Sequence, residues 1–289
     1  MPRDVSNMRP VVVLAGLFPT YTTHLVRTLR TLNLSVIVVS GQRDRSVINA
    51  LRRVERCGGY VLSGRESVAH RVKELLSLPC RDASPPLWAF QAFDSADAGK
   101  TATMQWLRKN GLANHAIERY NTTDPSNTPL PVIAKPVFGG AGHGVQVIHL
   151  RATLTRLLAT RRHLILERPI YNDTEWGVHF TAHSGECLRM ACVRITFKQT
   201  MFVRSRHVQA LKSIVWGNCP SELRLLTTRI VQRSNYTGFG CIGIKYVADV
   251  PFVIEVNPRL CGMFVKRNAL LRDHITTLTA RMHATCPIF

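Results

Sequence analysis

Lys135 and the glycines that follow it form the segment of this 289-residue sequence with the clearest chemistry. Lys135 stands near the end of the β-branched run VIAKPV, and Gly139, Gly140, Gly142 and Gly144 precede a second apolar run, VQVIHL. Glycines let backbone N–H groups approach a polyphosphate with no Cβ in the way. A Walker loop would lead through Gly-Lys-Ser/Thr into a helix, whereas a strand follows here. The segment predicts a phosphate-covering glycine loop on a hairpin, with a flexible turn and an incidental lysine as the alternative.

A second candidate site lies in LERPIYNDTE, where Glu167 and Glu175 flank a short connector after an apolar run. The Arg168 carbonyl and the Ile170 N–H offer the acceptor and donor that an adenine edge requires. Glu175, some residues later, could accept the ribose hydroxyls. The alternative is that both glutamates are ordinary solvated surface residues.

A third candidate site is FVIEVNPRLCG, which combines an acidic residue with an apolar strand. Glu255 and Asn257 are two residues apart, so in a strand both side chains point to one face. A carboxylate and an amide oxygen suit Mg²⁺, which takes few protein ligands and completes its sphere with phosphate and water. Arg259 follows Pro258 and carries the planar fork that binds phosphate. The pattern predicts a magnesium and phosphate site.

The first ninety residues alternate between strands and helices. VVVLAGL, SVIVVSG and the weaker GGYVLSG read as strands, and TTHLVRTLRTLNL and SVINALRRVERC read as helices. This order predicts a parallel sheet with covering helices. No G-x-G-x-x-G follows the first strand, which argues against a dinucleotide site and favours a packing domain that forms one wall of a cleft.

The remaining residues predict a mixed α/β unit. ADAGKTATMQWLRKNGL reads as a helix that ends at Gly111, because glycine terminates helices readily. The runs VIAKPV, GVQVIHL, HLILERPI, WGVHFTAH and CLRMACVRITF read as strands. A helix is expected at 221–233, before a hairpin of GCIGIKYV and PFVIEVN.

The formal net charge of +20 raises the question of nucleic-acid binding. Only eight of the 38 basic residues are lysines, no run of five basic residues occurs, and no nucleic-acid-binding motif is present. An anionic substrate explains part of the charge more economically.

The apolar run 11–18 is too short to span a bilayer, and no basic-then-apolar leader precedes it. We therefore expect a cytoplasmic protein that binds neither nucleic acid nor membrane.

Eight cysteines are scattered along the chain without a C-x-x-C pair or zinc-finger spacing. In a cytosolic chain such residues are expected to be buried, reduced thiols. The sequence thus predicts neither a structural metal nor a disulfide framework.

Together and in this order, these segments resemble the ATP-grasp superfamily over about the last two hundred residues. The helix segment AGKTATMQWLRKNGL is similar to the one that bears the first phosphate lysine, which corresponds to Lys100. AKPVFGGAGHGV resembles the second lysine with its loop, and LERPI…TE resembles the adenine hinge, with Glu167 and Ile170 at the base and Glu175 at the ribose. IEVNPRLCG resembles the metal-binding element.

The resemblance implies a small pre-ATP-grasp domain at 1–90 and an ATP-grasp domain at 91–289, with a lysine and glycine-loop subdomain (91–165) and a metal-binding subdomain (166–289). It implies ATP with Mg²⁺, or Mn²⁺ in its place, and small-molecule carboxylate and amine substrates. The implied reaction forms an amide or peptide bond through an acyl phosphate. A homodimer is an open alternative to a monomer.

In this scheme Lys100, Lys135 and the glycine loop hold the α- and β-phosphates. Arg259 stabilises charge on the γ-phosphate and the acyl phosphate. Arg194, on a strand expected to face the cleft, is a further partner for a phosphate or a substrate carboxylate.

The sequence departs from the family pattern at two places. Gly99 replaces the acidic residue that usually precedes the first lysine. Gly243, Ile244 and Lys245 stand where one further metal ligand is expected, and none of them binds Mg²⁺ readily. An ATP-binding pseudoenzyme or regulatory module, and an ATP-grasp kinase without ligation, therefore remain alternatives to the ligase.

Overall fold

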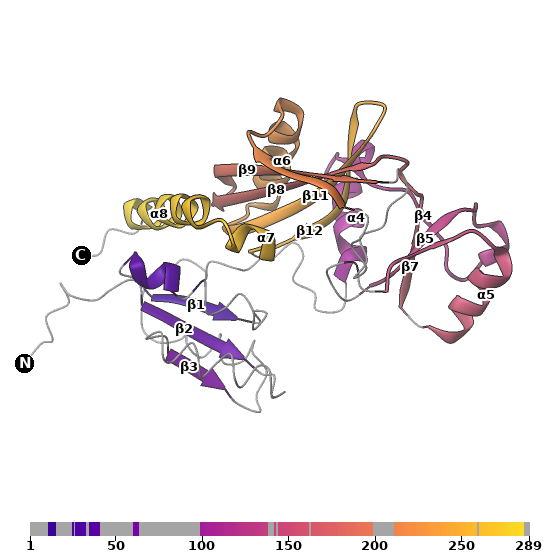
Figure 1. The fold of residues 1–289 in the computed structure, drawn as a ribbon, viewed down its shortest axis with the longest axis horizontal. Coiled ribbons are helices and arrows are strands. Elements are labelled where there is room, and N and C mark those ends of the chain that lie inside the picture. The colour runs from indigo at the N-terminus through magenta and orange to yellow at the C-terminus, as the bar shows by residue number, and fades with distance from the viewer. Residues whose placement is uncertain are drawn as a thin grey trace, which may run out of the picture. The chain divides into compact units, whose positions relative to one another are not determined.

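A computed structural model describes most of the chain in two compact units. The described residues are 11–15, 25, 27–32, 35–40, 60–63, 99–137, 142, 144–161, 163–198, 211–258 and 260–285. One unit comprises residues 1–87 and 260–289, and the other comprises residues 88–259. Figure 1 labels the helices and strands of both units.

The first unit contains a three-stranded parallel sheet. Its strands are β1 (Val11–Ala15), β2 (Ser35–Ser40) and β3 (Tyr60–Ser63), in the order β1-β2-β3. Residues 27–31 are helical between β1 and β2, with Leu29 buried, as the leucine spacing predicts. The helix expected at 46–57 lies outside the described residues. The unit ends with α7 (Gly262–Val265) and α8 (Asn268–Thr285).

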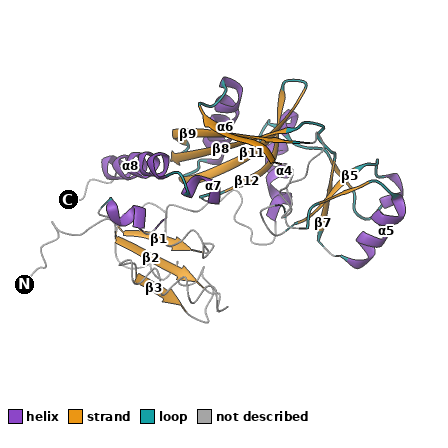
Figure 2. Ribbon diagram, viewed as in Figure 1, coloured by secondary structure: helices purple, strands orange, loops and turns teal. Residues whose placement is uncertain are grey.

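The second unit contains two antiparallel sheets, drawn in orange in Figure 2. The larger sheet has the order β10-β9-β8-β11-β12, with β8 (Thr174–His183), β9 (Glu186–Phe197), β10 (Leu211–Gly217), β11 (Gly238–Val247) and β12 (Val250–Asn257). The smaller sheet has the order β4-β7-β5-β6, with β4 (Arg119–Tyr120), β5 (Val132–Pro136), β6 (Gln146–Ile148) and β7 (Leu164–Glu167). The expected strands and the terminal hairpin are confirmed, and β10 was not predicted.

Among the described residues of this unit, helices pack against one face of the larger sheet. The helical elements of this unit are α4 (Gly99–Lys109), η2 (Ala113–His115), η3 (Pro125–Asn127), α5 (Arg151–Thr160) and α6 (Ser221–Ser234). Leu226 and Ile230 of α6 and Leu107 of α4 are buried in one core with Val178 and Phe180 of β8. Since strand side chains alternate, the odd-numbered residues of β8 face the opposite side. That second face carries Glu255 and Asn257 of β12.

The smaller sheet has an apolar core of its own. Leu154 of α5 is buried with Val132 and Ala134 of β5 and Leu166 of β7. Two separate cores within residues 88–259 correspond to two subdomains. The expected architecture, a small parallel sheet followed by a two-part α/β domain, is confirmed.

The prediction that no disulfide forms is wrong. Cys192 and Cys219 are joined, with their Cα atoms 5.0 Å apart. Gly217 at the end of β10 pairs with Cys192 on β9. Cys219 follows Gly217 by two residues and therefore lies close to Cys192. Strand pairing rather than sequence spacing brings these cysteines together.

Among the described residues, no helix is long and apolar enough to cross a membrane.

Candidate functional site

Lys135 links the smaller sheet to the strand that carries the predicted metal ligands. Its Nζ lies 2.5 Å from Oε2 of Glu167 and donates to the carbonyl oxygen of Ile254 at 3.2 Å. Ile254 directly precedes Glu255 on β12. The side chains of Lys135 and Glu167 are 8% and 2% exposed, so this ion pair is buried. Buried charges are retained only when they are well paired, which this geometry provides.

Lys100 reaches the same place from the first turn of α4. Its Nζ donates to the carbonyl oxygen of Pro136 at 3.0 Å, one residue after Lys135. Burial lowers the pKa of Lys100, the charge of Lys135 lowers it further, and the carboxylates of Glu255 and Glu167 raise it. A lysine and two carboxylates from three other elements therefore act electrostatically on Lys100.

Arg119 is a member of this cluster that the sequence did not indicate. It lies opposite Glu167 in the β4–β7 pair, and its Nε and Nη2 each lie 3.0 Å from Oε1 of Glu167. Burial lowers the pKa of Arg119, and the charge of Glu167 raises it. Glu167 thus accepts from a different cation at each carboxylate oxygen. Arg119 sits on a two-residue strand, which is too short to show any periodicity.

The predicted metal ligands lie on the face of the larger sheet that α6 does not cover. On β12, Glu255 pairs with Gly243 and Asn257 pairs with Cys241 of β11, and directly paired residues share a face. A Cβ at Gly243 would lie 3.2 Å from Cγ of Glu255. Glycine at 243 therefore leaves room for the Glu255 side chain, and both predicted ligands point to one side as expected.

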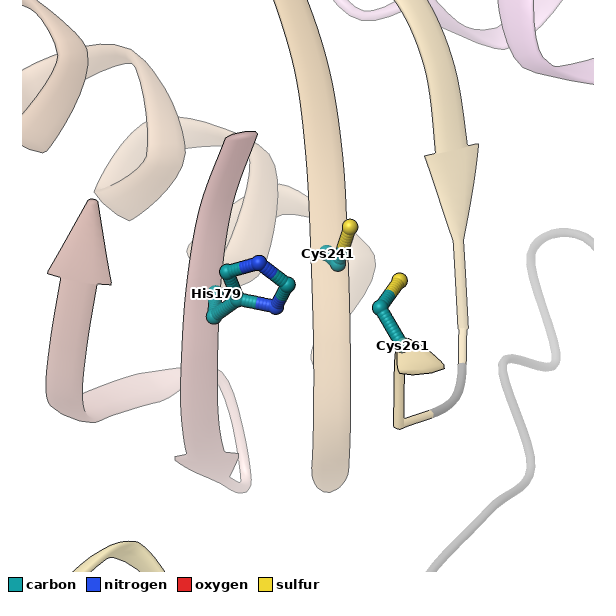
Figure 3. Close-up of side chains that lie close together, drawn as sticks. All are labelled: His179, Cys241 and Cys261. Carbon is teal, nitrogen blue, oxygen red and sulfur yellow. The ribbon is translucent and has the colours of Figure 1, made fainter. Parts of the chain in front are cut away.

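The row that contains Asn257 continues across the sheet. Cys241 pairs with His179 of β8, and their ligand atoms lie within 4.8 Å of one another (Figure 3). The His179 ring stacks on Trp216 at 5.2 Å between centroids. Cys261, also labelled in Figure 3, belongs to the other unit. A histidine and a thiol thus stand beside the predicted metal ligands on the same face.

The predicted adenine hinge follows β7 without a break. Ile170 is buried, whereas the side chain of Arg168 is 61% exposed and lies 3.9 Å from the carboxylate of Glu118. The Arg168 N–H donates to the carbonyl oxygen of Glu118 at 3.0 Å. The hinge backbone is therefore fixed against the segment before β4, and the Arg168 side chain points into solvent.

Lys245 and Glu175 lie near the far end of this hinge. Lys245 is buried, its Nζ donates to the carbonyl oxygen of Asn172 at 3.0 Å, and it lies 5.8 Å from the Phe197 ring centroid. Burial lowers the pKa of Lys245, and the carboxylates of Glu175 and Asp173 raise it. An ammonium group therefore stands where the family pattern leads one to expect a metal ligand, and it is directed to the hinge.

The arrangement as a whole is suited to a polyanion. Lys100, Lys135 and Arg119 bring three positive charges against the two carboxylates Glu167 and Glu255. Clustered cations with preorganised partners bind phosphates strongly where water is partly excluded.

The family model of the ATP-grasp domain matches residues 97–263, more than half of the chain. This protein belongs to the ATP-grasp family. No curated protein matches the sequence significantly.

Solved ATP-grasp structures have a similar fold at low sequence identity. D-Alanine–D-alanine ligase from Bacillus anthracis, complexed with ATP, aligns with a TM-score of 0.58 and 13% identity, over 96% of this chain and 99% of that one. Carboxyaminoimidazole ribonucleotide synthase from Aspergillus clavatus, complexed with ATP, gives 0.64 and 15%, over 95% and 77%. L-Amino acid ligase from Bacillus licheniformis gives 0.57 and 15%, over 93% and 74%. These likenesses establish the fold.

One predicted residue is not brought to the ATP-grasp site face. On β9, Ile195 pairs with Glu175 and shares its face, so Arg194 points to the opposite side. Arg194 pairs with Trp176 and its guanidinium lies 5.9 Å from that ring. Arg194 was expected on a strand that faces the cleft, and the strand register directs it to the face opposite Glu175. Its role as a partner of a phosphate or a substrate carboxylate stays a prediction.

Parts of the predicted ATP-grasp loops lie outside the described residues. These are Gly139, Gly140 and Arg259. Gly142 and Gly144 are described, and each has a φ of +73°, which favours glycine. A Cβ at Gly144 would lie 2.9 Å from Cγ of Pro136, so the return of the loop requires glycine there.

Proposed function

We propose that this protein is an ATP-dependent carboxylate–amine ligase that activates an amino acid or a small carboxylic acid as an acyl phosphate. The observation that supports it best is the convergence of Lys100, Lys135, Glu167 and Glu255. Lys135 contacts Glu167 and the residue before Glu255, and Lys100 is influenced by all three of the other side chains. Phosphoryl transfer to a carboxylate requires positioning and charge neutralisation, which such a cluster supplies.

The nucleotide would lie along the line from the hinge to the two lysines. Arg168 and Ile170 would meet the adenine edge through their backbone groups, and Glu167 would also lie at the adenine base. Glu175 would bind the ribose hydroxyls. Lys100 and Lys135, with Gly139, Gly140 and Gly142 covering them, would hold the α- and β-phosphates. Arg259 would stabilise charge on the transferred phosphoryl group.

Glu255 and Asn257 fit Mg²⁺ by the chemistry of their donors. A carboxylate and an amide oxygen on one sheet face are hard oxygen ligands, and the glycine opposite Glu255 leaves space beside them. When bound, the ion would neutralise charge on the phosphates. Mn²⁺ has similar ligand preferences and is an alternative ion.

Lys245 supports a second candidate function, ATP binding without turnover. Gly243, Ile244 and Lys245 stand at the positions where a further metal ligand is expected, and the ammonium of Lys245 is instead held by the hinge carbonyl of Asn172. A site with one metal ligand fewer could retain nucleotide affinity while losing the charge neutralisation that the chemical step requires.

Release of ADP and phosphate across a panel of amino and small organic acids tests the proposal. With the correct carboxylate but no amine, hydroxylamine should trap the acyl phosphate as a hydroxamate. Lys135→Ala should abolish the product. Lys109→Ala, an exposed lysine at the end of the same α4 helix that carries Lys100, should leave it unchanged.

The outcomes separate the candidate functions. A hydroxamate that depends on Mg²⁺ and on Lys135 supports the ligase. Nucleotide binding with neither ADP release nor carboxylate-dependent scrambling of the β,γ-bridge oxygen of ATP supports the binding protein. A stable phosphate ester without hydroxamate would refute ligation and indicate a kinase.

A further inference from the structure

We propose that Arg119 is a positioning residue for nucleotide binding, which keeps Glu167 paired when Lys135 turns to a phosphate and fixes the helix turn that carries Lys100. The inference rests on the proposed function, since it concerns binding of the phosphates of ATP. Arg119 itself is assigned no contact with the nucleotide.

The contacts of Arg119 join three elements. Nε and Nη2 lie 3.0 Å from Oε1 of Glu167 on β7. Nη1 donates to the carbonyl oxygen of Thr101 at 3.1 Å, and Nη2 donates to that of Lys100 at 2.7 Å, both in the first turn of α4. The side chain is 13% exposed. A planar guanidinium can make these contacts at once, whereas a lysine ammonium on a single stem cannot.

Glu167 is the counter-ion of Lys135 and of Arg119, so a phosphate that binds Lys135 competes with Glu167 for it. Its Oε2 lies 2.5 Å from Nζ of Lys135. A phosphate that draws Lys135 away would leave a carboxylate that is 2% exposed, and a buried charge without a partner is strongly disfavoured. Because Arg119 binds the other carboxylate oxygen, Glu167 stays paired during the exchange. Without Arg119, Lys135 would be the principal partner of Glu167 and would be released to a phosphate less readily.

The second consequence concerns Lys100. Its Nζ reaches the carbonyl oxygen of Pro136 from α4, so its position depends on where the first turn of that helix lies. Arg119 ties the carbonyl groups of this turn to β4, which is paired with β7. One guanidinium therefore sets the spacing between the two phosphate lysines, whose charges already influence each other.

Calorimetric titration with Mg-ATP tests the inference on wild type, Arg119→Gln, Arg119→Lys and the control Arg156→Gln. Arg156 is an exposed arginine of α5 in the same unit. Arg119→Gln should weaken binding roughly tenfold or more, the effect of losing a charge-assisted hydrogen bond. Arg119→Lys should fall between wild type and Arg119→Gln, because it keeps the charge but not the fork. Arg156→Gln should bind as wild type does.

A double-mutant cycle with Glu167→Gln separates positioning from general damage to the fold. With no carboxylate to hold Lys135 back, Arg119→Gln should cost less in the Glu167→Gln background than in the wild type, and the loss that remains measures its hold on the first turn of α4. An equal loss in both backgrounds, or wild-type affinity in Arg119→Gln, would overturn the inference. If Arg119→Gln does not fold, Arg119→Lys decides, and wild-type affinity there would overturn it. Absence of Mg-ATP binding by the wild-type protein would instead refute the proposed function.

Discussion

Replacing Glu167 by glutamine should destabilise the protein far more than an ordinary charge substitution. Each oxygen of this buried carboxylate faces a different cation, Lys135 at one and Arg119 at the other. A glutamine side chain of the same shape offers one oxygen, so its NH₂ group must face a donor. The two buried cations would then repel each other without an intervening negative charge.

The expected cost follows from the burial of all three side chains. Their exposed fractions are 2% for Glu167, 8% for Lys135 and 13% for Arg119. Breaking a buried ion pair by removing one partner costs about 3–5 kcal/mol. For a unit of this size, about 2–4 °C of melting temperature is lost per kcal/mol, which predicts a decrease of about 6–20 °C.

Thermal and urea unfolding of Glu167→Gln, without nucleotide, measure this effect. Glu118→Gln is the matched control, since Glu118 is 58% exposed and lies 3.9 Å from an exposed Arg168. The control should change the free energy of unfolding by less than about 1 kcal/mol. A similarly small change in Glu167→Gln would refute the view that Glu167 is the shared counter-ion of two buried cations.

Four further outcomes are expected. Glu255→Gln should abolish ATP turnover with little change in melting temperature, and near-wild-type turnover would contradict the metal assignment. Mg-ATP at a hundredfold excess over its dissociation constant should stabilise the protein by about 2.7 kcal/mol, and an unchanged melting midpoint would count against nucleotide binding. Burial lowers the pKa of Lys100, and a bound phosphate would raise it. ATP affinity should therefore fall with rising pH, starting below the ordinary lysine pKa of 10.5. An affinity that is constant up to pH 10.5 would disprove this. Reducing the disulfide between Cys192 and Cys219, which are 27 residues apart, should cost about 3–4 kcal/mol from loop closure, and equal melting midpoints with and without reductant would argue otherwise.

Elements with a strong local pattern could be predicted from the sequence. The leucine and methionine spacing of α4, the glycine after it and the β-branched runs of β5 and β12 each encode their own conformation. Gly111 has a φ of +66°, as expected of a residue that ends a helix. The juxtaposition of Lys135 with the strand of Glu255 follows from the family resemblance rather than from any periodicity.

Other features depend on which strands pair. Arg119 and the disulfide have no signal in sequence spacing. The pairing of β4 with β7 brings Arg119 opposite Glu167, and the pairing of β10 with β9 brings Cys219 close to Cys192. Helix α5 has no acidic residue in its first turn and no side-chain cap, so the usual start signals are missing. Its Leu154, Leu157 and Leu158 nevertheless have helical spacing, and that pattern could have been recognised.

The bond from Lys135 to the carbonyl oxygen of Ile254 connects two sheets that have separate apolar cores. A phosphate that takes Lys135 as its own partner must weaken this bond while occupying the space beside it. The smaller sheet would then gain rotational freedom in the same event that fills the site. The rate of amide hydrogen exchange in β5 and β12 would therefore report nucleotide binding, even in a variant that is catalytically inactive.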